Sequence, residues 1–588
     1  MIKVFLNYLA VLFFLTPIIF IGCKTENHSV GDLMALKGGV YSGGVFKVNS
    51  NEEFRTLYPP YINEDAGLHI GSLIFEGLVK LNQSNLTVIP CLAEKVEKSD
   101  DAKTWTFHLR KGVKFHDNGC FEDGKGREVT AQDFKFCFDR LCEFNPDNQQ
   151  FGITFKDRVL GASEYNLSTK RGKPLPEGVS GVKVLDEYTL EVVLNYSFSG
   201  FLNVLSMPGC WLYPKEALEK YGKDIRVNCV GTGPFELKST ISNDALFLDR
   251  NKSYWAKDEN GNQLPYLDGV KYTFIKDKKK EMAEFKKGNL DMLFGLPTEM
   301  ISQVLDELNH AKDGSLRFEV QHVPAMGIEY YGFQHKDELF GKREVRLAFN
   351  YAIDREKIVN QQLEGDGIPA KFGIVPPSFS GYDNKSIKGY SFNPDTAKML
   401  LAKAGYPKGK GFPKLTLEIN NGGEQHILVA NAIKQMLKEN LNIEVLIHEQ
   451  PFAQHMETYE TGKSLFWRTS WVADYPDPES FLTVLYGKHV PANLYERSYV
   501  NSVRYQNPIF DSLFQLALRE ADPIKRLKLY AAADQIQVND AAIMPIYYHE
   551  NFRLIQQWVK SFDANPLEYR DLTAVYFIPK NEIKSTKP

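Results

Sequence analysis

Residues 415–447 predict an α/β fold for this chain. Alternating apolar residues indicate a strand at 415–419, a helical pattern follows at about 425–439, and a second strand pattern covers 443–447. Strand, helix and strand in this order, with short connections, are typical of a βαβ unit in which helices pack against a sheet. We therefore expect a compact three-layer α/β domain in this part of the chain.

Strand and helix patterns are interleaved elsewhere as well. Residues 104–109, 189–194 and 272–275 carry β-branched and aromatic side chains at alternate positions, which predicts strands. Asn393-Pro394-Asp395 supplies a helix cap with proline in the first turn, and Gly405 supplies a stop. The sequence has no repeat of fixed period, so a solenoid or a propeller is not expected.

The composition is that of an ordinary globular protein. Of the 588 residues, 43% are hydrophobic and 24% are charged, which excludes a disordered or collagen-like chain. The length suggests about three or four domain-sized units. A net charge of -4 leaves no excess of positive charge to bind a phosphate backbone, so we expect no nucleic-acid partner.

The first residues have the pattern of an export signal. Lys3 precedes an apolar run at 4–21 that ends at Gly22-Cys23. The run is nearly long enough to cross a bilayer, so an uncleaved membrane anchor is the alternative. A small residue before a cysteine resembles the cleavage motif of bacterial lipoproteins. We favour a signal peptide at 1–22, lipid on Cys23, a tether at 23–37 and a place in the cell envelope, on the periplasmic side or the cell surface.

Six further cysteines would then meet an oxidising environment. They allow fifteen pairings, which the sequence alone does not resolve. We favour a bridge between Cys210 and Cys229, because they flank a compact stretch with a short helix. The alternative, of equal weight, is that several are buried thiols. No C-x-x-C spacing or cysteine and histidine cluster is present in the sequence, so we expect no metal site and no cofactor.

Catalytic motifs are absent from the sequence. Residues 119–126 fit a phosphate-binding loop up to Gly126, which replaces the serine or threonine that would bind magnesium, and we expect a surface turn there. Neither G-x-S-x-G nor H-E-x-x-H occurs, and the twelve histidines are scattered. We therefore expect a protein that is not an enzyme.

From Gly38 onward the chain resembles family 5 of the bacterial extracellular solute-binding proteins, which includes the oligopeptide- and dipeptide-binding components of ABC importers. The motifs that carry the resemblance occur in order along the chain: residues 74–78 (IFEGL), 90–94 (PCLAE), 104–116 (TWTFHLRKGVKFH), 129–134 (VTAQDF), 231–235 (GTGPF), 345–355 (VRLAFNYAIDR) and 473–478 (ADYPDP). Together they cover nearly the whole mature chain. Most look like fold residues: the glycines of 231–235 as turn formers with unusual backbone angles, and Thr130 to Asp133 as a capping box.

The resemblance implies the architecture. It is an α/β, two-lobed periplasmic-binding-protein fold of the large class II type, with an extra domain inserted in the first lobe. Carried onto this chain, the first lobe covers 38–70, 178–270 and 555–588, the extra domain 71–177, and the second lobe 271–554. A peptide would be enclosed between the two lobes.

Residues 468–474 form the candidate ligand-binding segment. A free peptide carries an α-ammonium group, which is costly to take out of water unless an opposite charge meets it. In the proteins that this segment resembles, the residues at the places of Asp474, Trp471 and Arg468 have three roles. The aspartate pairs with the ammonium, the tryptophan covers a side-chain pocket, and the arginine meets the C-terminal carboxylate. We expect all three side chains to be near neighbours; the alternative is a surface ion pair beside a core tryptophan.

Two departures bear on this assignment. Val472 stands where some members have a bridged cysteine, so that bridge is absent. Asp477 is a second carboxylate with a claim on the ammonium, although it lies between two prolines and could serve to shape the loop.

We expect a monomeric, lipid-anchored receptor that binds short peptides and hands them to a membrane permease and its ATPase subunits. The same family includes receptors for nickel complexes, haem, sugars and signal peptides, which remain alternatives. A surface adhesin that has lost transport is another alternative. An enzyme is the least favoured, because no paired acids, nucleophile or metal ligands are visible in the sequence.

Overall fold

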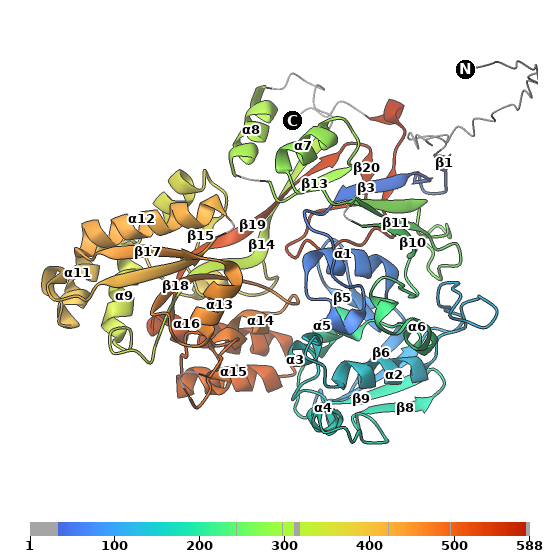
Figure 1. Ribbon diagram of the computed structural model, residues 1–588, viewed down its shortest axis with the longest axis horizontal. Helices are drawn as coiled ribbons and strands as arrows, with labels where there is room; N and C mark the ends of the chain where they lie inside the picture. The colour runs from blue at the N-terminus through green and yellow to red at the C-terminus, as the bar shows by residue number, and fades with distance from the viewer. Residues whose placement is uncertain are drawn as a thin grey trace, which may run out of the picture.

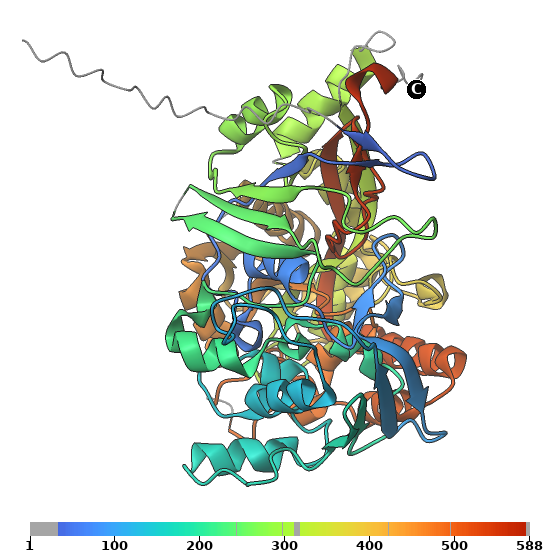
Figure 2. The same ribbon diagram turned by 90° about the vertical axis from the view of Figure 1, so that its right-hand side faces the viewer.

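The computed structural model describes residues 33–583, apart from 243, 297, 311–317, 422, 494 and 495. Figure 1 shows two groups of elements side by side, joined by long strands. Figure 2 shows that the elements of residues 71–177 lie at the end of the molecule opposite helices α7 (Lys278–Lys286) and α8 (Thr298–His310). The fold is therefore the expected two-lobed α/β architecture. The predicted boundaries of the lobes stay predictions, and we keep "first lobe", "extra domain" and "second lobe" as names for those residue ranges.

One mixed sheet of eleven strands runs through both lobes. Its order is β10-β11-β12-β3-β13-β19-β14-β18-β16-β17, with the short β15 beside β19. The strands are β3 (Val45–Asn49), β10 (Phe235–Ile241), β11 (Ala245–Arg250), β12 (Gly269–Thr273), β13 (Met292–Phe294), β14 (Phe318–Phe333), β15 (Ile368–Pro369), β16 (Leu415–Asn420), β17 (Val445–Gln450), β18 (Phe466–Val472) and β19 (Ile543–Gln556). The long antiparallel pair β14 and β19 connects the two lobes (Figure 1).

The predicted βαβ unit is confirmed in the second lobe. Strands β16 and β17 pair in parallel, and α12 (Glu424–Leu441) connects them. The helix predicted after Asn393 is α11 (Pro394–Lys403), and the Asn393 side chain accepts a hydrogen bond from the backbone N of Thr396 at 3.0 Å. The other helices of this lobe are α9 (Arg343–Ala352), α10 (Arg355–Lys357), α13 (Phe452–Glu460), α14 (Glu479–Leu482), α15 (Pro508–Arg519) and α16 (Pro523–Asn539).

A second, four-stranded antiparallel sheet lies in and beside the extra domain. Its order is β6 (Ala93–Lys98), β7 (Thr104–Leu109), β9 (Thr189–Val193) and β8 (Val182–Asp186), which confirms two of the predicted strands. Helix α2 (Ala131–Cys142) begins with the predicted capping box, in which Asp133 accepts from the backbone N of Thr130 at 2.9 Å. The other helices here are α1 (Asp65–Ile74), α3 (Gln150–Ile153), α4 (Ala162–Lys170), α5 (Phe201–Leu205) and α6 (Lys215–Tyr221). Short strands complete the fold: β1 (Met34–Ala35), β2 (Tyr41–Ser42), β4 (Val79–Leu81), β5 (Val88–Pro90), β20 (Val559–Lys560) and β21 (Tyr576–Phe577).

The glycines of the 231–235 motif serve close packing and not unusual backbone angles. Neither Gly231 nor Gly233 has a positive φ, so the predicted reason for these glycines is wrong. A Cβ on Gly231 would lie 2.0 Å from the carbonyl oxygen of Ile74, and one on Gly233 would lie 2.6 Å from it. The motif therefore packs directly on the C-terminal end of α1, where only glycine fits.

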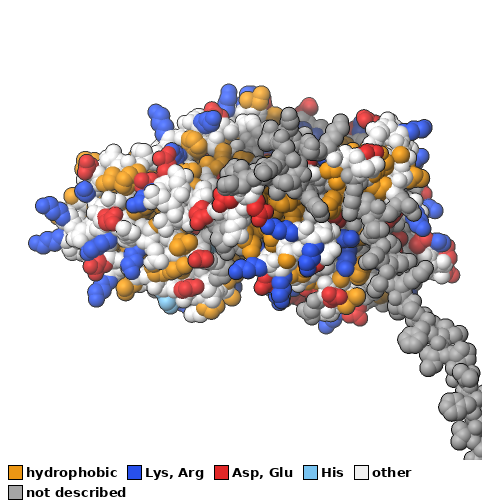
Figure 3. All heavy atoms as spheres, turned by 90° about the horizontal axis from the view of Figure 1, so that it is seen from above, with side chains coloured by type: hydrophobic (Ala, Val, Ile, Leu, Met, Phe, Trp, Pro, Cys, Tyr) orange, Lys and Arg blue, Asp and Glu red, His pale blue; other side chains and the backbone are white. Residues whose placement is uncertain are grey.

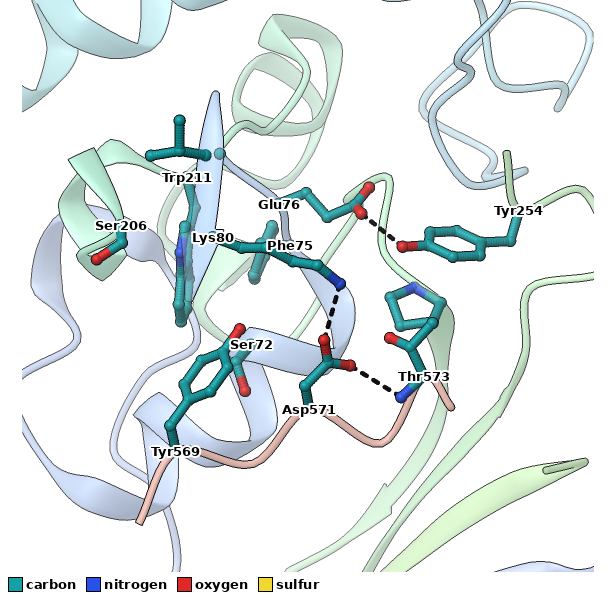
Figure 4. Close-up of a pocket in the computed structure, with 13 residues that line it drawn as sticks. Ser72, Phe75, Glu76, Lys80, Ser206, Trp211, Tyr254, Tyr569, Asp571 and Thr573 are labelled. Carbon is teal, nitrogen blue, oxygen red and sulfur yellow. Dashed lines mark hydrogen bonds and ion pairs between the residues drawn. The ribbon is translucent and has the colours of Figure 1, made fainter. Parts of the chain in front are cut away.

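Buried Glu76 ties several of the recognised motifs together. Its carboxylate accepts hydrogen bonds from Thr232 at 2.9 Å, from Tyr254 at 2.7 Å and from the indole of Trp255 at 3.1 Å. Beside it, Lys80 pairs with Asp571 at 2.7 Å, which fastens the C-terminal segment of the first lobe to the extra domain (Figure 4). The cavity between these groups measures about 20 Å³, which is too small for a ligand.

The predicted bridge between Cys210 and Cys229 is wrong. All six cysteines of the described residues are free, and both of these are buried. The sulfur of Cys210 faces the carbonyl oxygen of Val204 at 3.6 Å, whereas that of Cys229 faces the carbonyl oxygen of Ile225 at 4.0 Å. Each thiol is thus packed within its own turn, as in the alternative of buried thiols.

The N-terminal expectations fall outside the described residues, since Cys23 and the predicted signal peptide precede residue 33. Among the described residues, no helix combines the length and the apolar character needed to cross a membrane. Residues 119–126 form turns without a helix, as predicted. Acidic and basic side chains are intermingled over the face shown in Figure 3, without a continuous basic surface.

Candidate functional site

The three predicted ligand-binding residues lie on β18 and in the turn that follows it. β18 pairs with β14 in regular register, with Arg468 opposite Tyr331 and Trp471 opposite Ile328. Side chains alternate between the two faces of a strand, so Arg468 and Trp471 point to opposite faces. Trp471 and Asp474 are close in the sequence, but the Arg468 side chain lies on the opposite face of β18 from Trp471. This contradicts our expectation that all three side chains are near neighbours.

Arg468 is buried in an ion pair that the sequence did not reveal. Its Nε and Nη2 donate to the two carboxylate oxygens of Glu329 at 2.5 and 2.6 Å, and its Nη1 donates to Asn420 at 2.8 Å. Burial raises the pKa of Glu329, but the charge of Arg468 outweighs burial and holds this pKa below its ordinary value. The positive charge of Arg468 is thus balanced inside the protein, in a buried pair and not in the surface pair of the alternative.

Three histidines surround this pair. His549 lies 3.9 Å from Glu329, His455 hydrogen-bonds the backbone oxygen of Arg468 at 2.8 Å, and His426 hydrogen-bonds the backbone oxygen of Asn420 at 3.2 Å. Burial lowers the pKa of His455 to about 4, which keeps this ring neutral near pH 7. The sequence offered no signal for this cluster, because its members are far apart in the chain.

Trp471 is half-buried against the apolar core of the second lobe. Its indole nitrogen is shielded from water and has no hydrogen-bond partner among the described residues. Buried indole N–H groups usually find a partner. Trp471 therefore offers one unmatched donor beside an apolar ring face.

Asp474 offers the complementary unmatched acceptor. Its backbone N donates to Ser480 at 3.1 Å, but its carboxylate forms no ion pair or hydrogen bond with any described residue. The side chain keeps access to solvent, yet the surrounding protein desolvates it, and together with the charge of Glu479 this raises its pKa to about 6. Arg158 acts in the opposite direction.

The other acids around Asp474 each have a cation. Asp477 pairs with Arg526 at 2.6 Å, Glu479 with Arg158 at 3.2 Å and Glu460 with Arg497 at 2.5 Å. Each of these three acids is at most 3% exposed. Asp477, the second candidate from the sequence, is therefore part of the loop structure. Asp474 is the carboxylate of this group that has no cation among the described residues.

An apolar rim surrounds Asp474. Val472 is 57% exposed and Tyr499 is 55% exposed. Burial and the charges of Asp474 and Glu460 raise the pKa of Tyr499. Sequence reasoning missed Tyr499, because it lies 25 residues beyond Asp474 in a loop with no regular pattern.

The backbone of β18 is open on one side next to this rim. β18 pairs with β16 only between Trp467 and Glu418, whereas its pairing with β14 extends to Val472. Within the described residues, the stretch from Thr469 to Val472 thus has a strand partner on one side only. An extended chain could add its backbone there, as in strand addition to a sheet edge. No group of three potential metal ligands lies within the described part of the chain.

Comparisons with known proteins find relatives over nearly the whole chain. A family model described as "Bacterial extracellular solute-binding proteins, family 5 Middle" matches residues 87–492. The periplasmic oligopeptide-binding protein OppA of Salmonella typhimurium is 29% identical over 90% of this chain and 92% of its own length. The dipeptide-binding protein DppE of Bacillus subtilis is 29% identical over 94% of this chain and 95% of its own. The solved structure of Haemophilus influenzae OppA with the peptide RPPGFSPFR aligns with a TM-score of 0.68 and 26% identity, over 91% of this chain and 99% of that one.

Proposed function

Because the chain belongs to family 5 of the bacterial extracellular solute-binding proteins, we propose that it is the peptide-capturing component of an ABC importer. In this proposal it binds short peptides between its two lobes and presents them to a membrane permease, whose separate ATPases drive transport. Its own residues perform no chemistry on the ligand. Relatives named for oligopeptide and dipeptide binding cover nearly the whole chain, which supports a peptide as the ligand.

The observation that carries the proposal is the unmatched carboxylate of Asp474. Asp474 is exposed, but the surrounding protein removes part of its water, and such a carboxylate gains when an ammonium group meets it. Its neighbours are already paired, so the ligand must supply the positive charge. The α-ammonium of a peptide is the group that fits, and Asp474 would fix where the peptide begins.

The surroundings of Asp474 suit the rest of a short peptide. The open side of β18 at Thr469 to Val472 would pair with the peptide backbone, which all sequences share. Trp471 and Tyr499 would cover the first side chains, and apolar contact of this kind tolerates many side chains. Affinity would then come from the ammonium and the backbone, with little dependence on sequence.

In this proposal, Arg468 does not bind the peptide carboxylate by charge. Its guanidinium is held by Glu329 and Asn420, so it adds no net positive charge to the site. In our proposal, Arg468 mainly fixes the position of β18 between β14 and β16. Recognition would therefore depend on the amino end of the peptide far more than on its carboxyl end.

We further propose that the protein acts as a monomer held in the cell envelope by lipid on Cys23. This rests on the Gly22-Cys23 motif at the end of the apolar N-terminal run. Labelled fatty acid should be incorporated into the wild-type chain and not into Cys23→Ala. Incorporation into both chains would remove this part of the proposal.

The proposal is tested by native mass spectrometry of the protein as purified from cells, followed by mild unfolding to release its ligand. A mixture of short peptides is expected, and the range of their lengths would define the site. A single haem, nickel complex or sugar would keep the fold but overturn the ligand.

A further inference from the structure

Arg158 reaches from the extra domain to the loop that follows Asp474 in the second lobe. Its Nη2 donates to the hydroxyl of Tyr475 and to the carboxylate of Glu479, both at 3.2 Å. Its Nη1 donates to the backbone oxygens of Ile153 and Thr154 in its own domain. The side chains of Arg158 and Glu479 are only 14% and 4% exposed. This guanidinium therefore bridges two parts of the molecule that belong to different lobes.

The backbone around Arg158 is fixed in the orientation that makes this bridge. Asp157, directly before it, has a φ of 60°, a left-handed conformation that few non-glycine residues adopt. The Ser163 hydroxyl donates to Asp157, and the backbone N of Asn195 donates to the backbone oxygen of Arg158 at 2.8 Å. The turn thus directs the Arg158 side chain toward the second lobe, while the backbone of the turn is held beside the four-stranded sheet.

A second arginine, Arg526, joins this contact from the second lobe. The guanidinium of Arg158 lies 5.5 Å from the ring centre of Phe198, and that of Arg526 lies 5.7 Å from the same ring. Arg526 belongs to α16 of the second lobe and pairs with Asp477. Phe198, from the first lobe, is fully buried. Two charged groups over one aromatic ring therefore join three parts of the chain next to residues 475–479.

We propose that Arg158 is a positioning residue for the ammonium site, which acts from the opposite lobe by binding Tyr475 and Glu479. This inference rests on the proposed function. Glu479 is a carboxylate close enough to Asp474 to affect it, and without a cation it would compete for the ligand's ammonium. Arg158 neutralises the charge of Glu479 and holds the loop that carries it. Of these two acids, Asp474 alone then faces the ligand. Because the contact spans the lobes, opening the molecule would break it and weaken the hold on the ligand.

The charges around Asp474 give this proposal a readout that a purely structural role would lack. Glu479 raises the pKa of Asp474 and Arg158 lowers it, while Tyr499 faces it from a separate loop and Asp477 is already paired. Loss of Arg158 should therefore raise the pH below which peptide binding fails. Loss of the charge on Glu479 should lower that pH. A change that only loosened the fold would move both variants in the same direction.

The test is calorimetric titration of the chain with trialanine between pH 5 and 8. Arg158→Gln should bind about tenfold more weakly at pH 7, within the usual range of coupling between sites, with its profile shifted to higher pH. Glu479→Gln should show a profile shifted to lower pH. Arg158→Lys should keep most of the affinity, and the swap Arg158→Glu with Glu479→Arg should recover part of what Arg158→Glu alone loses.

Arg127→Gln is the matched control. Arg127 also pairs with acids, Asp133 and Glu216, but all its partners lie outside the second lobe. The Arg127→Gln substitution should leave the affinity for trialanine and the pH profile of binding unchanged. Wild-type affinity and profile in Arg158→Gln, or an equal loss in Arg127→Gln, would overturn the inference while leaving the proposed function intact. Equal wild-type affinity for trialanine and N-acetyl-trialanine would overturn the proposed function, and the inference with it.

Discussion

Asp474 differs from the neighbouring acids because its carboxylate has no ion-pair partner among the described residues. Asp477, Glu479 and Glu460 each have an arginine within 3.2 Å, and the carboxylate of Asp474 has no partner in the described part of the chain. The surrounding protein removes part of the water from this exposed acid and supplies no cation, which costs the fold some stability. In our proposal the ligand-free molecule carries this cost, and peptide binding would remove it.

This cost predicts that Asp474→Asn stabilises the ligand-free protein. The folded-state pKa of Asp474 is about 6, above its ordinary value of 3.8, so the fold binds more protons than the unfolded chain between these values. The charged form therefore destabilises the fold most above pH 6, and this penalty decreases as the pH falls from about 6 toward 3.8. Thermal unfolding of ligand-free protein should show a higher midpoint for Asp474→Asn at pH 7.5 and a smaller difference at pH 5.

Glu338→Gln is the control, because Glu338 is exposed in a turn of the same lobe. Its midpoint should follow the wild type at both pH values. If Asp474→Asn lowered the midpoint at pH 7.5, the carboxylate would be a structural group and not a vacant ligand site.

The balanced charge of Arg468 leads to a second prediction about the ligand. Since Glu329 already neutralises this arginine, removing the negative charge of the peptide's C-terminus should cost little. Trialanine amide should bind within about threefold of trialanine, well under the tenfold that corresponds to 1.4 kcal/mol. A loss of a hundredfold in calorimetry would restore Arg468 to the carboxylate role that the sequence suggested.

How far the sequence could predict this site depends on where each partner lies. Asp474 could be proposed from the sequence, because a peptide's ammonium requires an acid and the segment resembles known binding proteins, and it stays a prediction. The pairing of Arg468 could not be inferred, since Glu329 lies 139 residues earlier on β14 and nothing in the local pattern connects them. Tyr499 and Arg158 were missed for the same reason, because tertiary contacts alone bring them to the loop.

Helices and strands were predicted where a local physical rule was strong. The βαβ unit and α11 follow from periodicity and from the cap at Asn393. The glycines at 231 and 233 show the limit of such rules, because turn chemistry suggested unusual angles and close packing on α1 is the actual reason. The pairing of β14 with β19, which joins the lobes, has no local sequence signal at all.

The packing of α1 on the 231–235 motif predicts a large effect from one methyl group. In Gly231→Ala the new Cβ would lie 2.0 Å from a backbone oxygen, so the chain must shift. We expect a loss of about 1–3 kcal/mol in the free energy of unfolding by urea, as for other overpacked sites. Gly152→Ala is the control, because a Cβ there meets no atom within 4 Å and the residue lies in α3. Equal stability of the two variants would contradict the packing.

The free thiols of Cys210 and Cys229 lead to a further prediction about the turns that carry them. Cys210 and Cys229 lie in separate turns with their own backbone contacts, so a reducing agent should not change the urea midpoint of the oxidised, purified protein. Thiol titration in denaturant should find both cysteines reactive. A lower midpoint under reduction would show that a bridge forms after export.

The molecule as a whole is two lobes that share one sheet. The strands β14 and β19 connect the lobes, and Arg158, Phe198 and Arg526 form a contact between them. We expect the lobes to move about these strands and the contact to break when they separate. Ligand binding at Asp474, next to this contact, should therefore favour the closed arrangement. Small-angle X-ray scattering should show a smaller radius of gyration with trialanine than without it, and an unchanged radius would contradict closure.

The central claim is that the charge of Asp474 holds the amino end of a peptide. The most direct measurement is calorimetric titration of wild-type protein and Asp474→Asn, each with trialanine and with N-acetyl-trialanine, at pH 7.5. Our account predicts that acetylation abolishes strong binding to the wild type, and that Asp474→Asn binds both peptides equally weakly. If the wild type binds both peptides equally well, or if Asp474→Asn still prefers the free amino end, another group holds the ligand and the account is contradicted.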